Sequence, residues 1–185
     1  MKKFLYIVVW LIALVVITGA LLFFEGHLLW KLQEMNLFLS TSMFLKEQMV
    51  VPGGLLTWVG MFFTQFFYWP WLGVLLLAAW WWLLMWLVKR AFRIPDLWAG
   101  LLLIPVAVLL MPFVTQGYWI YVLKLQGHCF TATIGTTAVA ALLWLYRLLP
   151  SKYYLRTAFV FLTCALGYPL MGIYGLAAPL LMALW

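Results

Sequence analysis

Three of the four acidic residues of the sequence lie between its first two long apolar runs, and one of them is a candidate for acid–base chemistry. They are Glu25, Glu34 and Glu47. A carboxylate at a membrane surface works as a general base when its surroundings tune its pKa and it reaches the proton that it removes. Glu34 is the candidate catalytic residue, because it follows the first run and would accept the proton of an acceptor hydroxyl. The alternative is an exposed carboxylate paired with Lys31, which is worth well under ~1 kcal/mol.

The other reactive residue types give no metal site. His128 stands beside Cys129, and one histidine with one cysteine is too small a ligand set for zinc. Cys129 and Cys164 lack CxxC spacing, so we expect both to be buried as small apolar side chains. The sequence has no phosphate-binding glycine loop and no HExxH or GxSxG motif. We therefore predict no metal and no cofactor.

The composition indicates that a lipid bilayer surrounds most of the chain. Hydrophobic residues make up 69% of the 185 residues and charged residues only 8%. Soluble domains have about 25% charged residues, so no soluble fold of this size would bury so much apolar surface. The net charge of +7 is spread over the ends of the apolar runs and forms no basic stripe, so we expect no nucleic-acid partner.

Five apolar runs match the length needed to cross a bilayer, which is about 20 residues for a helix. They are residues 4–24, 69–88, 97–114, 129–149 and 157–173. Backbone groups in hydrocarbon must bond within their own segment, so we predict an all-α, multi-pass membrane protein with a single domain over residues 1–185. The first run exceeds the core of a signal peptide and is expected to be retained. The interiors of the runs carry no charge, which argues against an ion pump.

The basic residues predict the orientation of these spans. Eight of the eleven Lys and Arg residues fall at the N-terminus or in the second and fourth connections, which share one side if five spans cross. These eight are Lys2, Lys3, Lys89, Arg90, Arg93, Arg147, Lys152 and Arg156. Cytoplasmic loops carry an excess of Lys and Arg, so we expect a cytoplasmic N-terminus.

The connection over residues 25–68 is then outside the cytoplasm, and it divides at Pro52-Gly53-Gly54. Before this point apolar residues recur close to helical spacing, at Leu28, Leu32, Met35, Leu39 and Met43. After it, the aromatic-rich segment 55–68 is too short to cross the bilayer and suits a helix that lies in the interface. We therefore expect one or two interfacial helices in this connection.

Three short motifs in this region resemble those of a known family. They are Glu34-Met35-Asn36-Leu37-Phe38, Pro52-Gly53-Gly54-Leu55 and Phe63-Thr64-Gln65-Phe66. Together they resemble a bacterial multi-pass membrane family of unknown function, chiefly from the Bacteroides group. The resemblance implies a bacterial inner-membrane protein. Members of that family are considerably longer, so we expect the chain to be an N-terminal fragment or a short relative.

More loosely, the layout resembles the N-terminal part of GT-C class membrane glycosyltransferases, which place a catalytic Asp or Glu in a large outside loop after the first span. Span 4–24, Glu34, segment 52–68 and span 69–88 occupy those places in order. The resemblance implies a lipid-phosphate-linked sugar donor, with Glu34 as base toward the acceptor. The chain departs from the pattern because Met35 follows a single Glu and no soluble sugar-binding domain is present.

Three functions follow as alternatives. The first is a GT-C-like transferase, or an incomplete remnant of one, with Glu34 facing a cavity open to water and lipid. The second is a non-enzymatic membrane subunit that packs against a larger membrane protein, with Glu34 in solvent or paired with Lys31. The third is a carrier of a lipid or another apolar solute, with a continuous path between its spans.

Overall fold

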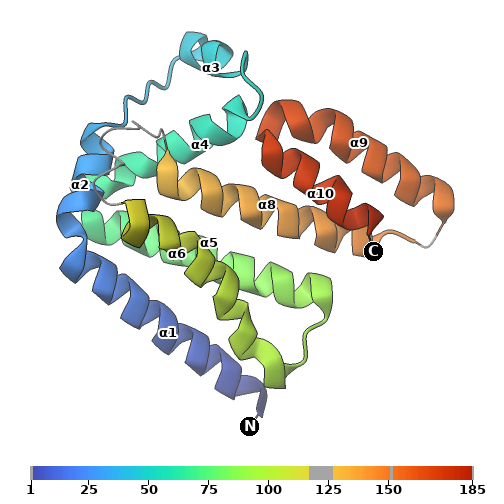
Figure 1. Ribbon diagram of the computed structural model, residues 1–185, viewed down its shortest axis with the longest axis horizontal. Helices are drawn as coiled ribbons and strands as arrows, with labels where there is room; N and C mark the ends of the chain where they lie inside the picture. Colours follow the sequence, from blue (N-terminus) through green and yellow to red (C-terminus); the bar gives the residue numbers. More distant parts are fainter. Residues whose placement is uncertain (1, 117–126, 151, 185) are drawn as a thin grey trace.

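The computed structural model describes residues 2–116, 127–150 and 152–184, and these residues form helices joined by short connections, with no strand among them (Figure 1). The α-helices are α1 (Lys2–Phe24), α2 (Gly26–Glu34), α3 (Ser42–Gln48), α4 (Gly54–Thr64), α5 (Pro70–Phe92), α6 (Leu103–Gln116), α8 (His128–Leu148), α9 (Tyr153–Met171) and α10 (Ile173–Ala183). The two 3-10 helices are η1 (Gln65–Tyr68) and η2 (Asp96–Leu102). The predicted all-α, multi-pass class is confirmed.

Four of the described helices are long and apolar enough to cross a membrane. They are Tyr6–Phe24, Pro70–Phe92, Cys129–Leu148 and Tyr153–Met171, and they coincide with four of the five predicted spans. The remaining predicted span, 97–114, is divided into η2 and the shorter helix α6. Pro105 explains the division, because it has no N–H for the carbonyl four residues earlier and is tolerated only in the first turn of a helix.

Basic side chains lie together at one set of ends of the long helices. In Figure 1 the N-terminus lies at the bottom and the C-terminal ends of α5 and α8 lie at the right, whereas α2, α3 and α4 lie toward the upper left. At the first of these ends Lys89 of α5 lies 3.2 Å from the centroid of the Tyr6 ring of α1. Arg147 of α8 donates a hydrogen bond to the Ala91 carbonyl of α5. The cations near these helix ends therefore lie close together.

The connection over residues 25–68 forms the other end of the bundle. Its predicted helical pattern is interrupted after α2, because Asn36 Nδ2 donates to the Met61 carbonyl at 2.8 Å and holds the chain against α4. Helix α4 packs along the start of α8, where Gly60 leaves so little room that an added Cβ would overlap the Thr131 hydroxyl. The Gly53 N–H donates to the Pro169 carbonyl of α9 at 3.0 Å. These contacts fix α4 to the long helices.

Aromatic side chains fill the core between these helices. Trp81, Phe67 and Phe130 are fully buried. Trp80 makes an edge contact with Phe63, and Trp82 makes one with Trp10. Edge-to-face pairs of this kind are worth about 0.5–1.5 kcal/mol beyond the burial of area. The tryptophan run of α5 therefore serves packing between α1, α4 and α8.

Candidate functional site

The candidate catalytic residue predicted from the sequence lies on the surface at the end of α2. Glu34 Oε2 accepts from Lys31 Nζ at 2.6 Å, and the two side chains are 41% and 49% exposed. Glu34 is not among the residues that line the three cavities described below. Its role as a base stays a prediction, and its surroundings are those of an exposed ion pair.

The other reactive residues are spread over the fold. His27 lines a cavity of about 450 Å³ beside Trp30 and Tyr68, at the same end as Glu34. Cys129 is buried as predicted, but the prediction for Cys164 is wrong, because it lies exposed on the outward face of α9. Among the described residues, no three His, Cys, Asp or Glu side chains come together as they would around a metal ion.

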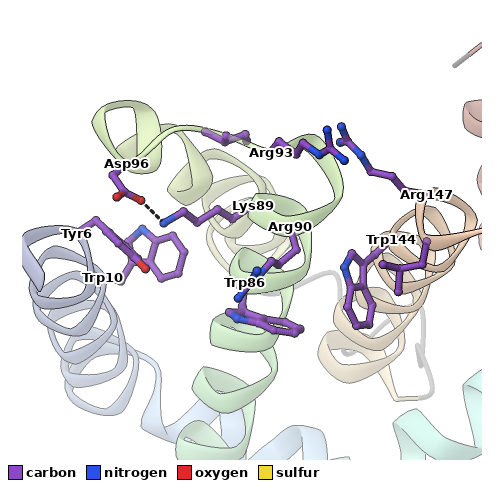
Figure 2. A pocket seen from close by; sticks show the side chains of 11 residues that line it. Tyr6, Trp10, Trp86, Lys89, Arg90, Arg93, Asp96, Trp144 and Arg147 are labelled. Carbon is purple, nitrogen blue, oxygen red and sulfur yellow. Dashed lines mark hydrogen bonds and ion pairs between the residues drawn. The ribbon is translucent and has the colours of Figure 1, made fainter. Parts of the chain in front are cut away.

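A different group of side chains surrounds the cavity at the N-terminal end of α1 (Figure 2). This cationic cavity has a volume of about 600 Å³ and lies between α1, α5, α8 and the connection that follows α5. It is lined by Tyr6, Trp10, Trp86, Lys89, Arg90, Arg93, Ile94, Asp96, Trp144, Arg147 and Leu148. Among the described residues, its lining thus holds four cations and a single carboxylate.

The single carboxylate of the cationic cavity is already paired. Asp96 Oδ1 accepts from Lys89 Nζ at 2.6 Å, and the ammonium group also lies over the face of the Tyr6 ring. A cation over an aromatic face is stabilised by the ring quadrupole. Lys89 and Asp96 therefore neutralise one another, and the positive charge of the cavity comes from its three arginines.

The three arginines come from two helix ends and one connection. Figure 2 shows the guanidinium groups of Arg93 and Arg147 directed toward one another, and the charge of Arg93 acts unfavourably on that of Arg147. Arg147 is held by its bond to the Ala91 carbonyl. Arg90 lies 5.6 Å from the Trp86 ring centroid. Like charges brought together in this way favour an anion between them.

The local sequence explains how Arg93 reaches the cavity. Helix α5 ends at Phe92, and Arg93 adopts the left-handed conformation, with φ 50° and ψ 43°. Among the described residues it is the one non-glycine with positive φ. The Ile94 N–H then returns to the Lys89 carbonyl at 3.2 Å, which closes the helix end. Left-handed backbone costs roughly 1–2 kcal/mol for a residue with a Cβ, so the site maintains an unfavourable backbone conformation at this residue.

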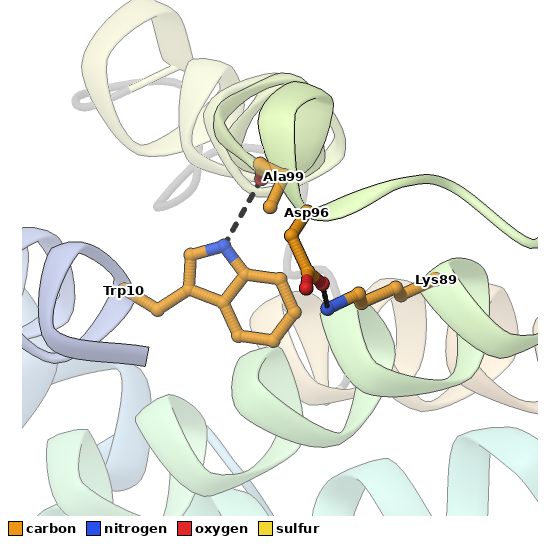
Figure 3. A network of polar contacts seen from close by, with 4 residues as sticks. All are labelled: Trp10, Lys89, Asp96 and Ala99. Atoms are coloured by element: carbon orange, nitrogen blue, oxygen red, sulfur yellow. Dashed lines mark hydrogen bonds and ion pairs between the residues drawn. The ribbon is translucent and has the colours of Figure 1, made fainter. Parts of the chain in front are cut away.

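Trp10 and Asp96 fix the connection after α5 on both sides (Figure 3). The buried Trp10 indole donates from Nε1 to the Ala99 carbonyl at 3.0 Å, which joins α1 to η2. Asp96, at the start of η2, binds Lys89 of α5. The two contacts hold α1, η2 and α5 in one arrangement and form one wall of the cationic cavity.

A second cavity lies on the other side of this wall. This apolar groove has a volume of about 560 Å³ and runs between α1 and η2. It is lined by Tyr6, Val9, Trp10, Asp96, Leu97, Ala99 and Gly100. Three of its lining residues also line the cationic cavity, namely Tyr6, Trp10 and Asp96. The two cavities are therefore neighbours that share one boundary.

The chemistry available in the cationic cavity is binding. Guanidinium groups hold phosphate or carboxylate oxygens through paired N–H donors. In the part of the chain that the structure describes, no histidine, cysteine or serine lines the cavity, and Asp96 is occupied by Lys89. Sequence reasoning assigned these cations to membrane orientation and missed the cavity. A usable signal was the pairing of Trp86 with Arg90 and of Trp144 with Arg147, at helical spacing near the ends of two spans.

The fold and the cavity define an all-helical, multi-pass membrane protein with a cationic cavity at one end of its helix bundle. The chain belongs to a family of unknown function, DUF6057, which it matches over residues 2–185. No curated protein and no solved structure matches the chain.

Proposed function

We propose that this protein binds a phosphate-bearing anionic ligand in the cationic cavity, in the inner membrane of a bacterium and with its N-terminus in the cytoplasm. The observation that supports this most directly is the convergence of Arg90, Arg93 and Arg147 on one cavity whose single carboxylate is paired with Lys89. Basic pockets between membrane helices on the cytoplasmic side are suited to anionic lipid head groups.

The type and placement of the cations support a bound anion over a role in orientation alone. Orientation depends only on the number of Lys and Arg residues near the span ends, and exposed side chains would serve it equally well. Here Arg93 holds an unfavourable backbone conformation, and Arg147 is fixed by the Ala91 carbonyl. Strained backbone that is kept in place by its surroundings tends to occur at ligand sites.

The position of Glu34 fits the alternative functions predicted from the sequence to different degrees. Glu34 is exposed and paired with Lys31, which is the arrangement expected of a non-enzymatic membrane protein. A GT-C-like transferase would use Glu34 at the end of α2, whereas the cationic cavity lies at the N-terminal end of α1. A binding protein needs no group besides the arginines, and we therefore favour binding over transfer.

Ligand binding by the purified protein tests this function. The probe is dihexanoyl phosphatidylglycerol, a short-chain anionic lipid used below its micelle-forming concentration, and dihexanoyl phosphatidylcholine is the zwitterionic comparison. We expect Arg93→Gln to weaken binding of the anionic probe by roughly ten- to a hundredfold, because a charged hydrogen bond is worth about 1.5–3 kcal/mol. Lys152→Gln, an exposed charge change outside the cavity lining, is the control. Equal affinity of Arg93→Gln and the unchanged protein would refute the proposal.

A further inference from the structure

The shared boundary of the two cavities suggests what kind of molecule carries the anion. The cationic cavity and the apolar groove, of about 600 and 560 Å³, meet along Tyr6, Trp10 and Asp96. Each volume lies within the range of ligand pockets in proteins, about 300–1,000 Å³. A strongly charged cavity beside an apolar one matches a ligand with a charged end and an apolar end.

The apolar groove faces the surroundings of the bundle. Val9 of α1 is 43% exposed, and Leu97 of η2 is 89% exposed. Beyond the groove, exposed apolar side chains continue along η2 and α6 at near-helical spacing; they are Leu101, Ile104, Val108 and Met111. In a membrane such a face is in contact with hydrocarbon. The apolar end of a ligand could therefore leave the groove directly into the bilayer.

The residues at the boundary of the two cavities resemble those found at the depth in a membrane where a lipid head group joins its acyl chains. Trp10 donates its indole N–H to Ala99, so its polar atom is satisfied, and its buried ring makes edge contacts with Tyr6 and Trp82. Tyr6 is covered by the Lys89 ammonium on one face. Because Asp96 is paired with Lys89 at this boundary, the net positive charge that attracts a phosphate lies with the arginines of the cationic cavity. Amphipathic aromatic side chains prefer this depth of a membrane.

We propose that one phosphate-bearing lipid occupies both cavities, with its head group among the arginines of the cationic cavity and one acyl chain in the apolar groove between α1 and η2. The inference rests on the proposed function and adds the identity of the ligand as a lipid, in place of a soluble phosphate compound. Burial of an acyl chain adds about 0.8 kcal/mol for each methylene removed from water, so long-chain lipids should be retained far better than short-chain ones.

Two groove variants and two probes test this. A Cβ at Gly100 meets no atom within 4 Å, so a side chain can start there without a backbone clash; Gly100→Leu adds apolar bulk to the groove from η2, and Val9→Trp adds it from α1. The probes are dihexadecanoyl and dihexanoyl phosphatidylglycerol, and retention on the protein is measured by native mass spectrometry. We expect both variants to lower retention of the long-chain lipid by at least about tenfold and to weaken binding of the dihexanoyl lipid less, because its chains place fewer methylenes in the groove. Leu75→Trp, at an exposed apolar site elsewhere on α5, is the control.

Photocrosslinking on the unchanged protein gives an independent reading. A phosphatidylglycerol with a diazirine in its acyl chain should label peptides that contain residues 6–10 or 96–100. Labelling confined to other helices, or full retention of the long-chain lipid by both groove variants, would overturn this inference. If Arg93→Gln still weakened the dihexanoyl probe in that case, the proposed anion site would stand without the chain. If Arg93→Gln changed neither probe, both proposals would fail.

Discussion

Arg93 combines a strained backbone with a charge that faces the cationic cavity, and one substitution separates the two properties. Glycine adopts left-handed backbone without a steric penalty, so Arg93→Gly should remove the strain of φ 50° at the end of α5. The added entropy of the unfolded chain offsets part of this gain. We expect the free energy of unfolding in mixed micelles to stay constant or rise by up to about 1 kcal/mol, while binding of anionic lipid falls as in Arg93→Gln.

The matched control for this prediction is Arg93→Lys. It keeps a positive charge and the strained backbone but loses the bidentate hydrogen-bond donation of a guanidinium group. It should leave the unfolding free energy unchanged and bind the anionic probe with intermediate affinity. A clear loss of stability in Arg93→Gly would show that the Arg93 side chain holds the fold together and would weaken its assignment to a ligand.

For Glu34, a stability measurement tests its ion pair with Lys31, and an activity measurement tests its predicted role as a base. Its bond to Lys31 joins two side chains that are 41% and 49% exposed, and exposed ion pairs contribute at most about 1 kcal/mol. We therefore expect Glu34→Gln and Lys31→Met each to change the unfolding free energy by less than about 1 kcal/mol. A lipid-linked sugar transfer assay tests the catalytic prediction, because loss of a general base lowers turnover by about 10²- to 10⁴-fold.

At this scale the sequence could predict the residue types but not their neighbours. The bond between Glu34 and Lys31 followed from helical spacing and is present. The proximity of Arg93 and Arg147 could not be predicted from the sequence, because the two residues lie on different segments. Only the packing of α5 against α8 brings them to one cavity. The exposure of Cys164 was also out of reach, because an apolar span does not show which of its faces is packed.

Among the elements, the hairpin of α9 and α10 depends on a close backbone approach at a pair of glycines, Gly167 and Gly175. A Cβ on Gly175 would overlap the Gly167 carbonyl, and a Cβ on Gly167 would press on Gly175. Small residues allow such approach in membrane helices. Because backbone must move to admit a side chain here, we expect Gly175→Ala to lower the unfolding free energy by about 1–3 kcal/mol or more.

The control for the hairpin is Gly19→Ala on α1. No atom lies within 4 Å of an added Cβ at Gly19, and alanine is the better helix former by about 1 kcal/mol. Gly19→Ala should therefore be neutral or stabilising in the same denaturation experiment, followed by tryptophan fluorescence. Equal effects of the two substitutions would show that the α9–α10 contact adds little to the stability of the fold.

Element by element, hydrophobic length predicted most of the fold. Four predicted spans coincide with α1, α5, α8 and α9, because each is an unbroken apolar run. Pro105 indicated that segment 97–114 is divided, but the high hydropathy of the segment led to the prediction of one continuous span. The interruption after α2 depends on the bond from Asn36 to the Met61 carbonyl, which joins distant parts of the chain and has no local signature.

For the whole molecule, the arrangement of charges connects the binding site with the orientation in the membrane. The cations of the cationic cavity lie at the end of the bundle that holds the N-terminus, and residues 25–68 form much of the other end. The positive-inside rule predicts that this cationic end faces the cytoplasm. The inner leaflet surface carries a negative potential that attracts basic groups, so the same orientation would present the cationic cavity to anionic lipid.

Thiol labelling of intact cells tests this orientation. In a Cys164→Ser background, where the remaining Cys129 is buried, single cysteines replace Ser42 at the start of α3 and Lys152 before α9, both of which are exposed. A membrane-impermeant maleimide should label Ser42→Cys in intact spheroplasts and Lys152→Cys only after permeabilisation, because α8 and α9 bring Lys152 to the end opposite α3. The reverse pattern would place the arginines outside the cytoplasm, where the leaflet argument for an anionic lipid no longer holds, and would leave Glu34 facing the cytoplasm.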